Sequence, residues 1–274
     1  MSVFKDKVCV ITGAGSGIGR ETARQLSELG AVVAISDIDA KGLEATRDMI
    51  GAGNRILVDI LDVSDKAAII AYPDKVKAAL GPADYVFNIA GLGRVGDVMH
   101  TPLDSMEQVM NVNFWGVIRM TKVFLPQLIE TKGVVTNISS MFGLIAFAGQ
   151  APYCASKFGV RGFTETLGLE MDEANTGVGV CCVHPGVVKT QIARNSIVDH
   201  LPEGLTKAQM EDDFDDLAVT PVDKAVSIIL DGTAKRKRRI LIGKDAKIGS
   251  FLQRLMPVKY QKVLQFYTKD KSVN

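Results

Sequence analysis

The chain has 274 residues, of which 47% are hydrophobic and 23% are charged. This composition is that of an ordinary globular protein, and it excludes a collagen, a disordered tail protein and a charge-driven polymer. The formal net charge of +1 conceals an uneven distribution, because residues 235–274 contain twelve Lys/Arg and two Asp/Glu, whereas the other 234 residues contain 20 and 29. A chain of this length can bury a large core without disulfides or structural metal ions.

The cysteines and histidines bear on the cellular compartment and on metal binding. The four cysteines form no Cys-x-x-Cys pair, and Cys181 and Cys182 would point to opposite faces of a strand, so we expect free thiols and a cytoplasmic location. His100, His184 and His200 are far apart along the chain and lack ligand-like spacing, which predicts no metal site. Residues 1–11 lack the pattern of a signal peptide, and no run of 18 apolar residues predicts a membrane span.

Short apolar runs alternate with longer amphipathic segments. The runs are rich in β-branched residues and bounded by Gly, Asp, Asn or Pro, which predicts strands at 8–11, 32–36, 56–61, 85–89, 134–138, 178–183 and 240–242. Helices are predicted between them at 18–29, 41–50, 65–80, 103–130, 152–173 and 222–231. Several runs lack polar alternation, which indicates burial on both faces. We therefore predict a single α/β domain over residues 1–274: a doubly wound, Rossmann-type, seven-stranded parallel sheet with helices on both faces.

A glycine-rich turn directly follows the first strand and opens a helix. Its sequence is Thr12-Gly13-Ala14-Gly15-Ser16-Gly17-Ile18-Gly19. Glycines let the backbone turn tightly and approach a diphosphate, whose charge is favoured at the free N–H groups of a helix N-terminus. Asp37 ends the second strand, 18 residues after Gly19, where a carboxylate can accept hydrogen bonds from an adenosine ribose. This context predicts a dinucleotide site rather than a chance turn of small residues.

Asp37 also bears on the choice of dinucleotide. Its carboxylate would repel a 2′-phosphate, and neither Ile38 nor Asp39 offers a cation, so we expect NAD(H) rather than NADP(H). Asp62, after the third strand, keeps two interpretations: contact with the adenine, or the cap of a helix that starts near Ser64.

Tyr153 and Lys157 lie four residues apart in a predicted helix, on one face and one turn apart. Pro152 suits the first turn of that helix. A neighbouring ammonium favours the phenolate and would lower the pKa of Tyr153 toward neutrality. Ser140 follows the fifth strand, at the edge of the sheet where ligands bind, and could hold a carbonyl or alkoxide oxygen.

In combination, these motifs resemble those of the short-chain dehydrogenases/reductases, in the Rossmann-type branch of about 250 residues. The resemblance spans roughly residues 5–245 and rests on Thr12-Gly13-x-x-x-Gly17-Ile18-Gly19, Asp62-Val63, Asn113, Ser140, Tyr153-x-x-x-Lys157 and Pro185-Gly186. One motif differs from the family pattern: the chain has Asn88-Ile89-Ala90-Gly91 where the family has Asn-Asn-Ala-Gly. The resemblance implies hydride transfer between a nicotinamide and an alcohol or ketone.

The resemblance also implies residue roles. Tyr153 would be the catalytic acid/base, Lys157 would lower its pKa and bind the nicotinamide ribose, and Ser140 would polarise the substrate oxygen. Asn113 would hold a water that links Lys157 to solvent, and its Asn-x-x-Gly spacing favours it over Asn111. The implied cofactor contacts, besides Tyr153 and Lys157, are Gly13, Ser16, Gly17, Ile18, Gly19, Asp37, Asp62, Val63, Asn88, Ala90, Gly91, Pro185, Gly186, Val188 and Thr190.

The substrate pocket is predicted from apolar residues near Ser140. Residues 141–147 are largely apolar, and residues 187–220 are polar, acidic and weakly periodic, as expected of a lid over a site. We assign Met141, Phe147, Val187 and Ile192 to the pocket, with Met210 as a further candidate. The predicted substrate is an apolar secondary alcohol or ketone that is steroid-, retinoid- or lipid-like. The equally weighted alternative is that these residues belong to the core or to a subunit contact.

The C-terminal segment is basic. Residues 235–239 are all Lys or Arg, and an extension over 246–274 carries apolar residues at helical spacing: Ile248, Phe251, Leu252, Leu255 and Met256, then Val263, Leu264, Phe266 and Tyr267. The favoured interpretation is a helix that packs on the body or on a sister subunit. The alternative is peripheral contact with an anionic membrane or with an acidic partner. Nucleic-acid binding is not expected, because the body is acidic and the basic run lacks interleaved aromatics.

The sequence leaves three alternatives to an NAD-dependent dehydrogenase. One is an NADP-dependent ketone reductase, and another is a non-catalytic dinucleotide-binding scaffold. A serine hydrolase that uses Ser140 and His184 is disfavoured, because no Gly-x-Ser-x-Gly motif surrounds Ser140. The resemblance implies a homodimer or homotetramer built on the helix of Tyr153, with Phe158, Phe163, Leu167 and Leu169 as candidate contacts.

Overall fold

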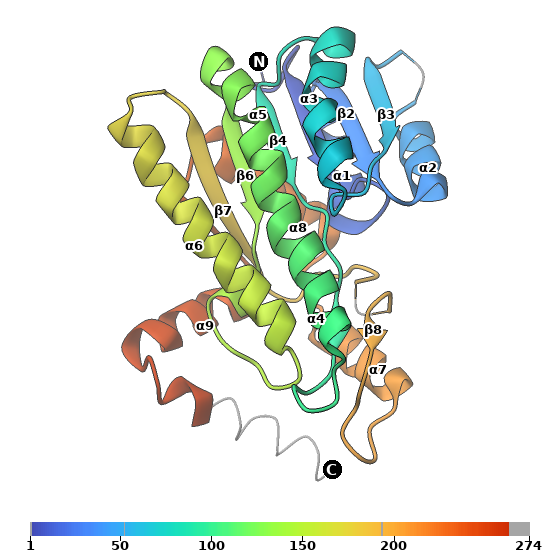
Figure 1. Ribbon diagram of the computed structural model, residues 1–274, viewed down its shortest axis with the longest axis vertical. Helices are drawn as coiled ribbons and strands as arrows, with labels where there is room; N and C mark the ends of the chain where they lie inside the picture. Colours follow the sequence, from blue (N-terminus) through green and yellow to red (C-terminus); the bar gives the residue numbers. More distant parts are fainter. Residues whose placement is uncertain (1, 52, 193, 263–274) are drawn as a thin grey trace.

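A seven-stranded parallel sheet forms the centre of the computed structural model, which describes residues 2–51, 53–192 and 194–262 (Figure 1). Its strand order is β3-β2-β1-β4-β6-β7-β9. The strands are β1 (Val8–Thr12), β2 (Val32–Asp37), β3 (Ile56–Ile60), β4 (Tyr85–Asn88), β6 (Val134–Ile138), β7 (Gly179–Pro185) and β9 (Arg239–Ile242). Each lies within two residues of a predicted strand, so the doubly wound α/β fold is confirmed.

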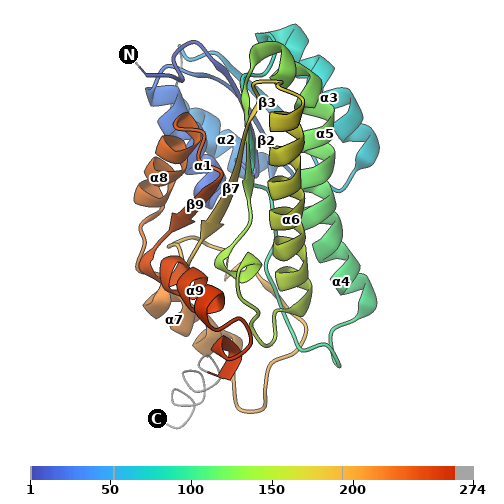
Figure 2. The ribbon, with the colours of Figure 1, turned by 90° about the vertical axis from the view of Figure 1, so that its left-hand side faces the viewer.

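Helices cover both faces of the sheet, as Figure 2 shows edge-on. One layer contains α1 (Gly17–Glu28), α2 (Ala40–Ile50) and α8 (Val222–Ala234), and the other contains α3 (Lys66–Leu80), α5 (Val117–Thr131) and α6 (Ala151–Glu173). Side chains of β1 alternate between the layers: Cys9 and Ile11 pack into the first, and Val8 and Val10 into the second. The fully buried Phe124 and other large side chains each stabilise the fold by about 1.5–3 kcal/mol.

The predicted helix at 103–130 is interrupted. The structure has α4 (Leu103–Met110), a π-helical turn (Asn111–Gly116) and then α5, so the prediction of one continuous α-helix is wrong at its middle. A π-turn holds one more residue than an α-turn, and this small change hardly alters the spacing of apolar residues from which the helix was predicted. Such turns occur frequently at functional sites.

Four further elements lie beyond the predicted ones. A second sheet pairs β5 (Arg94–Val95) with β8 (Ile197–Val198), and the predicted lid, which includes β8, also contains α7 (Lys207–Leu217), none of whose residues is buried. The fourth is α9 (Lys244–Leu255), which overlaps the predicted C-terminal extension. All of these gather at the end of the sheet where the strands terminate (Figure 1).

The basic run at 235–239 is tied to the body of the protein. Arg236 donates hydrogen bonds to the carbonyls of Lys132 and Gly177, and Arg239 pairs with Glu165. This accounts for much of the charge without an external partner. In α9, Ile248 and Phe251 are exposed, whereas Val263, Leu264, Phe266 and Tyr267 lie outside the described residues. Among the described helices, none is both long and apolar enough to cross a membrane.

Candidate active site

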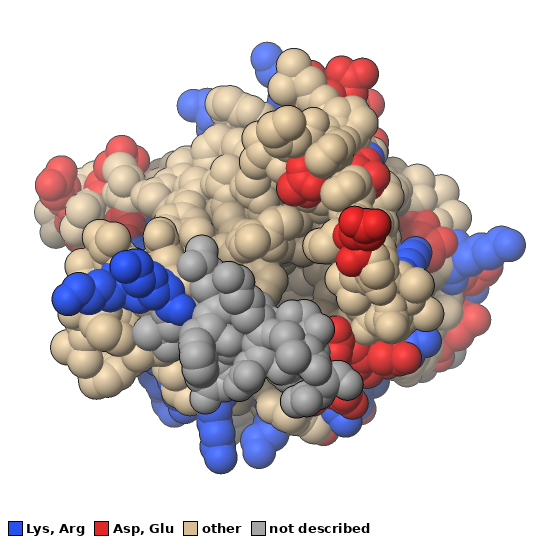
Figure 3. Space-filling view, turned by 90° about the horizontal axis from the view of Figure 1, so that it is seen from below, with Lys and Arg blue, Asp and Glu red and all other residues tan. Residues whose placement is uncertain are grey.

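The candidate site is a cleft at the carboxyl edge of the sheet, where the strand order turns back between β1 and β4. Its volume is about 2240 Å³, which is larger than the volume that a single small ligand occupies. Figure 3 looks onto this edge and shows the hollow, with acidic side chains gathered beside it. Of the predicted site residues, those that line the cleft are Gly13, Ser16, Gly17, Ile18, Gly19, Asp37, Asp62, Val63, Ala90, Gly91, Ser140, Met141, Phe147, Tyr153, Lys157, Pro185, Gly186, Val187, Val188, Thr190, Ile192 and the further candidate Met210.

The glycine-rich turn forms one wall and is packed too closely for larger residues. Gly13 has φ +70°, and a Cβ there would lie 2.7 Å from the Cα of Ala90. A Cβ on Gly19 would lie 2.0 Å from the carbonyl oxygen of Gly13. The hydroxyl of Thr12 accepts hydrogen bonds from the N–H groups of Ile89 and Ala90, so the ends of β1 and β4 are held together. The turn therefore leaves backbone N–H groups at the start of α1 available for a diphosphate.

Two carboxylates stand at the adenosine end of the cleft. Asp37 accepts hydrogen bonds from the N–H groups of Gly15, at 2.8 Å, and Asp39, at 3.0 Å. Asp62 accepts from the N–H of Ser64 but does not cap α3, because Asp65 is the residue that accepts from its first-turn N–H groups. The interpretation of Asp62 as a helix cap is therefore wrong. Asp62 lies in the cleft wall, and its contact with the adenine stays a prediction.

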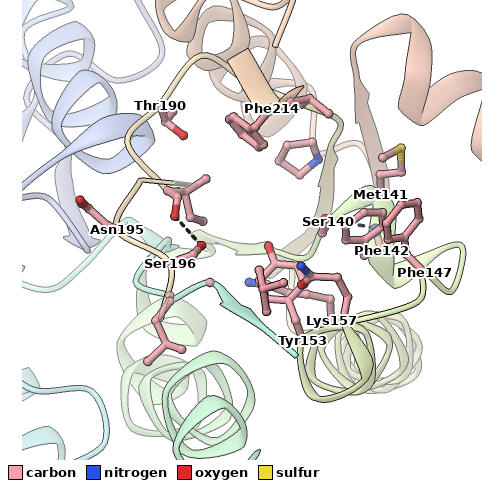
Figure 4. A pocket seen from close by; sticks show the side chains of 18 of the residues that line it. Ser140, Met141, Phe142, Phe147, Tyr153, Lys157, Thr190, Asn195, Ser196 and Phe214 are labelled. Carbon is pink, nitrogen blue, oxygen red and sulfur yellow. Dashed lines mark hydrogen bonds between the residues drawn. The ribbon is translucent and has the colours of Figure 1, made fainter. Parts of the chain in front are cut away.

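Tyr153 and Lys157 project from α6 into the cleft, and Phe214 of α7 faces them across it (Figure 4). The Lys157 Nζ lies 5.6 Å from the centroid of the Tyr153 ring and donates a hydrogen bond to the carbonyl of Ile138 at 3.0 Å. Ser140 begins a short 3₁₀ turn (Met141–Gly143), and its Oγ accepts a hydrogen bond from the N–H of Phe142. The end of β6 and the first turns of α6 thus bring all three predicted catalytic side chains to one wall.

Burial governs the protonation of this group. It raises the pKa of Tyr153 to about 12, although a hydrogen bond with the Ser140 hydroxyl acts in the opposite direction. Burial also lowers the pKa of Lys157 to about 8. In the protein alone, the pKa of Tyr153 thus moves opposite to the predicted direction, because desolvation outweighs any effect of an ammonium that is itself easily neutralised.

Asn113 and Asn88 do not line the cleft. Asn113 lies in the π-turn, where its side chain accepts from the N–H of Leu92 and donates to the carbonyl of the same residue. The side chain of Asn88 is buried, and its Nδ2 donates to Thr121 and Asn137. Asn111, which the spacing disfavoured, does line the cleft. Asn113 remains close to the site, because a Cβ on Gly91 would contact both its Oδ1, at 3.2 Å, and the Nζ of Lys157, at 3.7 Å.

The outer part of the cleft is apolar, and the sequence analysis identified only some of the residues that line it. Beyond the predicted residues, its wall includes Phe142, Ile145, Phe214, Leu217, Ile248 and Leu252. Phe214 and Leu217 lie one turn apart on α7, which begins with a capping box at Thr206 and Gln209. That Thr-x-x-Gln pattern is the sequence signal that would have predicted the helix. Asp245 of α9 was also missed, and it accepts a hydrogen bond from the N–H of Val187 and so fixes the turn after β7.

The histidines occupy two different surroundings. His184 is fully buried, and its Nδ1 lies 3.0 Å from the backbone carbonyl of Ser140, so the structure gives no support to a Ser140–His184 hydrolase. His100 and His200, expected to be apart, stack with their ring centroids 4.1 Å from each other. Asp97 lies between their Nδ1 atoms, and these three residues form a group that sequence spacing did not predict.

Comparison with known proteins agrees with this geometry. The sequence model of the family described as short chain dehydrogenase matches residues 7–200. SadH of Mycobacterium tuberculosis, which is named as an oxidoreductase, is 44% identical over 266 residues, 96% of each chain. Meso-2,3-butanediol dehydrogenase of Serratia marcescens is 36% identical over 69% of this chain and 74% of its own. A short-chain dehydrogenase/reductase of Burkholderia phymatum, solved in complex with NAD, superposes with a TM-score of 0.82 at 29% identity, over 93% of this chain and 95% of that one. The chain therefore belongs to the short-chain dehydrogenase/reductase family and is an NAD(P)-dependent oxidoreductase.

Proposed function

We propose that the protein transfers a hydride between NAD(H) and a bulky, apolar secondary alcohol or ketone. The observation that carries the proposal is that Ser140, Tyr153 and Lys157 share one cleft with the glycine-rich turn and Asp37. A dinucleotide fits this arrangement, because Gly13 and Gly19 leave no room for side chains where the backbone must approach a diphosphate. When bound, the nicotinamide supplies or accepts the hydride.

The protein residues then manage the proton. In the reducing direction, the Ser140 hydroxyl would donate a hydrogen bond to the substrate oxygen, and the Tyr153 phenol would give that oxygen its proton. In the oxidising direction, Tyr153 would accept the proton of the alcohol, with Lys157 stabilising the phenolate. Asn113, across Gly91 from Lys157, would hold the water that connects this ammonium to solvent.

The preference for NAD(H) rests on the charges around the ribose position. Asp37 lies in the cleft wall, followed by the exposed Ile38 and by Asp39. Arg20 is a cation close to this end of the cleft, and its guanidinium is engaged by Thr46 and by the carbonyls of Gly15 and Gly42. A 2′-phosphate would therefore meet the carboxylate of Asp37, while Arg20 is already occupied by other partners.

The substrate class rests on the apolar outer cleft. Met141, Phe147 and Ile192 line it, together with Phe214 and Leu252. A steroid-, retinoid- or lipid-like compound fits the size and the chemistry of this wall. A role of these residues in the core is opposed by their exposure in the cleft, and a subunit contact remains the alternative.

The proposal also covers the oligomeric state of the protein and its location in the cell. We infer a homodimer or homotetramer formed through α6, where Phe158 and Leu169 are exposed, whereas Leu167 is buried and serves the core. All four cysteines are free and buried, as suits a cytoplasmic protein. Contact of the C-terminal segment with an anionic membrane stays a secondary proposal, supported by the exposed Ile248, Phe251 and Leu255 on α9.

The first test is a fluorescence titration with NADH and, separately, NADPH, followed by turnover assays. We expect tighter NADH binding, weakened preference in Asp37→Ser, and lost turnover with retained NADH binding in Tyr153→Phe. Tighter NADPH binding would favour an NADP-dependent ketone reductase. A folded protein that binds neither would be a scaffold. Faster turnover of polyols than of apolar alcohols would overturn the substrate class.

A further inference from the structure

The predicted lid and the segment after β5 together carry a cluster of metal-ligating side chains away from the proton-transfer group. It consists of Asp97, His100 and His200, and the ligand atoms of the three lie within 4.8 Å of one another. The Asp97 carboxylate lies 2.8 Å from the Nδ1 of His100 and 2.5 Å from the Nδ1 of His200. The two rings stack with an interplanar angle of 19°. From this geometry we propose that Asp97, His100 and His200 form a binding site for a transition-metal ion of the Zn²⁺ type.

The donor set selects this class of ion. Two imidazole nitrogens and one carboxylate oxygen are ligands that suit Zn²⁺, Ni²⁺ and Cu²⁺, whereas Mg²⁺ and Ca²⁺ prefer oxygen donors throughout. Zinc bonds of about 2.0–2.2 Å place tetrahedral ligand atoms about 3.3 Å apart. The present contacts of Asp97 with the two Nδ1 atoms are shorter than this, at 2.8 and 2.5 Å, so the side chains must move apart slightly to admit an ion. The three side chains are 37–57% exposed, so rotation allows this adjustment and solvent can supply the fourth ligand.

The backbone around the cluster is already fixed. The β5–β8 ladder brings the segment that precedes Asp97 beside the segment that precedes His200. Gly96 allows this approach, because a Cβ there would lie 3.4 Å from the backbone nitrogen of His200 and closer still to Thr101. The carboxylate of Asp97 is oriented by the N–H groups of Met99 and His100. An ion would thus meet ligands on a prepared scaffold rather than on two independent loops.

A buried ion pair holds the same two segments together below the cluster. The Arg94 guanidinium contacts both carboxylate oxygens of Asp199, at 2.5 and 2.8 Å, and also donates to Gln108 of α4. Asp97 and His200 themselves line the cleft. A bound ion would therefore cross-link the lid to the loop after β5 at the mouth of the cleft, and it would slow the passage of substrate.

The test is equilibrium dialysis of the metal-stripped, full-length protein against Zn²⁺, with Co²⁺ absorption as an optical probe of imidazole ligation. We expect saturable binding of one Zn²⁺ per chain, weakened roughly tenfold or more in His100→Gln and in His200→Gln. Asp104→Asn, which removes a carboxylate from the same cleft wall outside the cluster, should leave binding unchanged. The three variants alter exposed side chains, and circular dichroism would verify their folding.

Several results would overturn the site. These are no saturable binding below millimolar Zn²⁺, binding that survives both histidine substitutions, or binding that Asp104→Asn weakens as much as they do. Zn²⁺ should also slow turnover of the unaltered protein but not of the His100→Gln/His200→Gln variant. Only that last measurement rests on the proposed activity, so failure of the metal site and failure of the proposed function are distinguishable.

Discussion

The ion pair between Arg94 and Asp199 gives a sharp test of how the lid is held. Their side chains are only 10% and 9% exposed, and the guanidinium makes two hydrogen bonds to the carboxylate. Asp199→Ala would leave a buried guanidinium with Gln108 as its remaining acceptor. Breaking a buried pair from one side costs about 3–5 kcal/mol, and we expect about 3 kcal/mol here because Gln108 stays.

The measurement is urea-induced unfolding at pH 7. The pair also holds the pKa of Asp199 below its usual range, so its contribution to stability is fully present above the unfolded pKa of about 3.9 and is lost as pH falls through the folded value. The double variant Arg94→Met/Asp199→Leu should recover most of the loss, because it leaves no unpaired charge. Glu130→Ala, which breaks the exposed pair with Lys77, is the matched control and should cost less than about 1 kcal/mol. An Asp199→Ala loss no greater than that of Glu130→Ala would refute the reasoning.

Three further predictions concern the site and its surroundings. Gly13→Ala should abolish NADH binding in a fluorescence titration, because its Cβ would strike Ala90, whereas Gly51→Ala, at φ +81° in open space, should bind normally. Lys157→Met should raise the free energy of unfolding at pH 7 by up to about 3 kcal/mol, because the pKa of Lys157 is about 8 in the fold and about 10.5 in the unfolded chain, so the buried charge destabilises the fold. This gain should shrink as the pH rises from 8 to 10.5, where the folded protein loses the proton first. Equal free energies of unfolding for the two proteins at pH 7 would contradict the prediction. Burial lowers the pKa of His184 to about 4, so the free energy of unfolding should fall by up to about 3 kcal/mol as the pH drops from 6.5 toward 4. His184→Gln should flatten this pH dependence of the free energy of unfolding, measured in denaturant titrations. An unchanged pH dependence would show that another group is responsible.

The regular part of the fold and the inner site were predictable because their signals are local. The apolar runs that became β1 and β6 are continuous in sequence, and Tyr153 and Lys157 need only helical spacing to share a face. The meeting of Ser140 with Tyr153 and Lys157 in one cleft then follows from the rule that parallel strands end at one edge.

The structure within the predicted lid was not predictable in the same way, because it depends on pairing with a distant part of the chain. β5 and β8 have two residues each and are joined across about a hundred positions, so neither has a periodicity to detect. The meeting of His100 with His200 follows from that pairing. The predicted direction of the pKa shift of Tyr153 was wrong for a related reason. The desolvation that raises this pKa depends on the assembled walls of the cleft, which the spacing of Tyr153 and Lys157 does not reveal.

The π-turn at Asn111–Gly116 fixes the rotational phase of α5. A π-turn takes up one more residue than an α-turn over nearly the same rotation, so the helix on either side keeps the phase of an uninterrupted α-helix. Regular α-helical bonding with the same number of residues would instead turn everything after Gly116 by the roughly 100° that one residue advances an α-helix. Met120, Phe124 and Leu128, which now face the sheet, would then point along its flank. The wide turn therefore lets the chain carry an additional residue here without misaligning the second layer of helices.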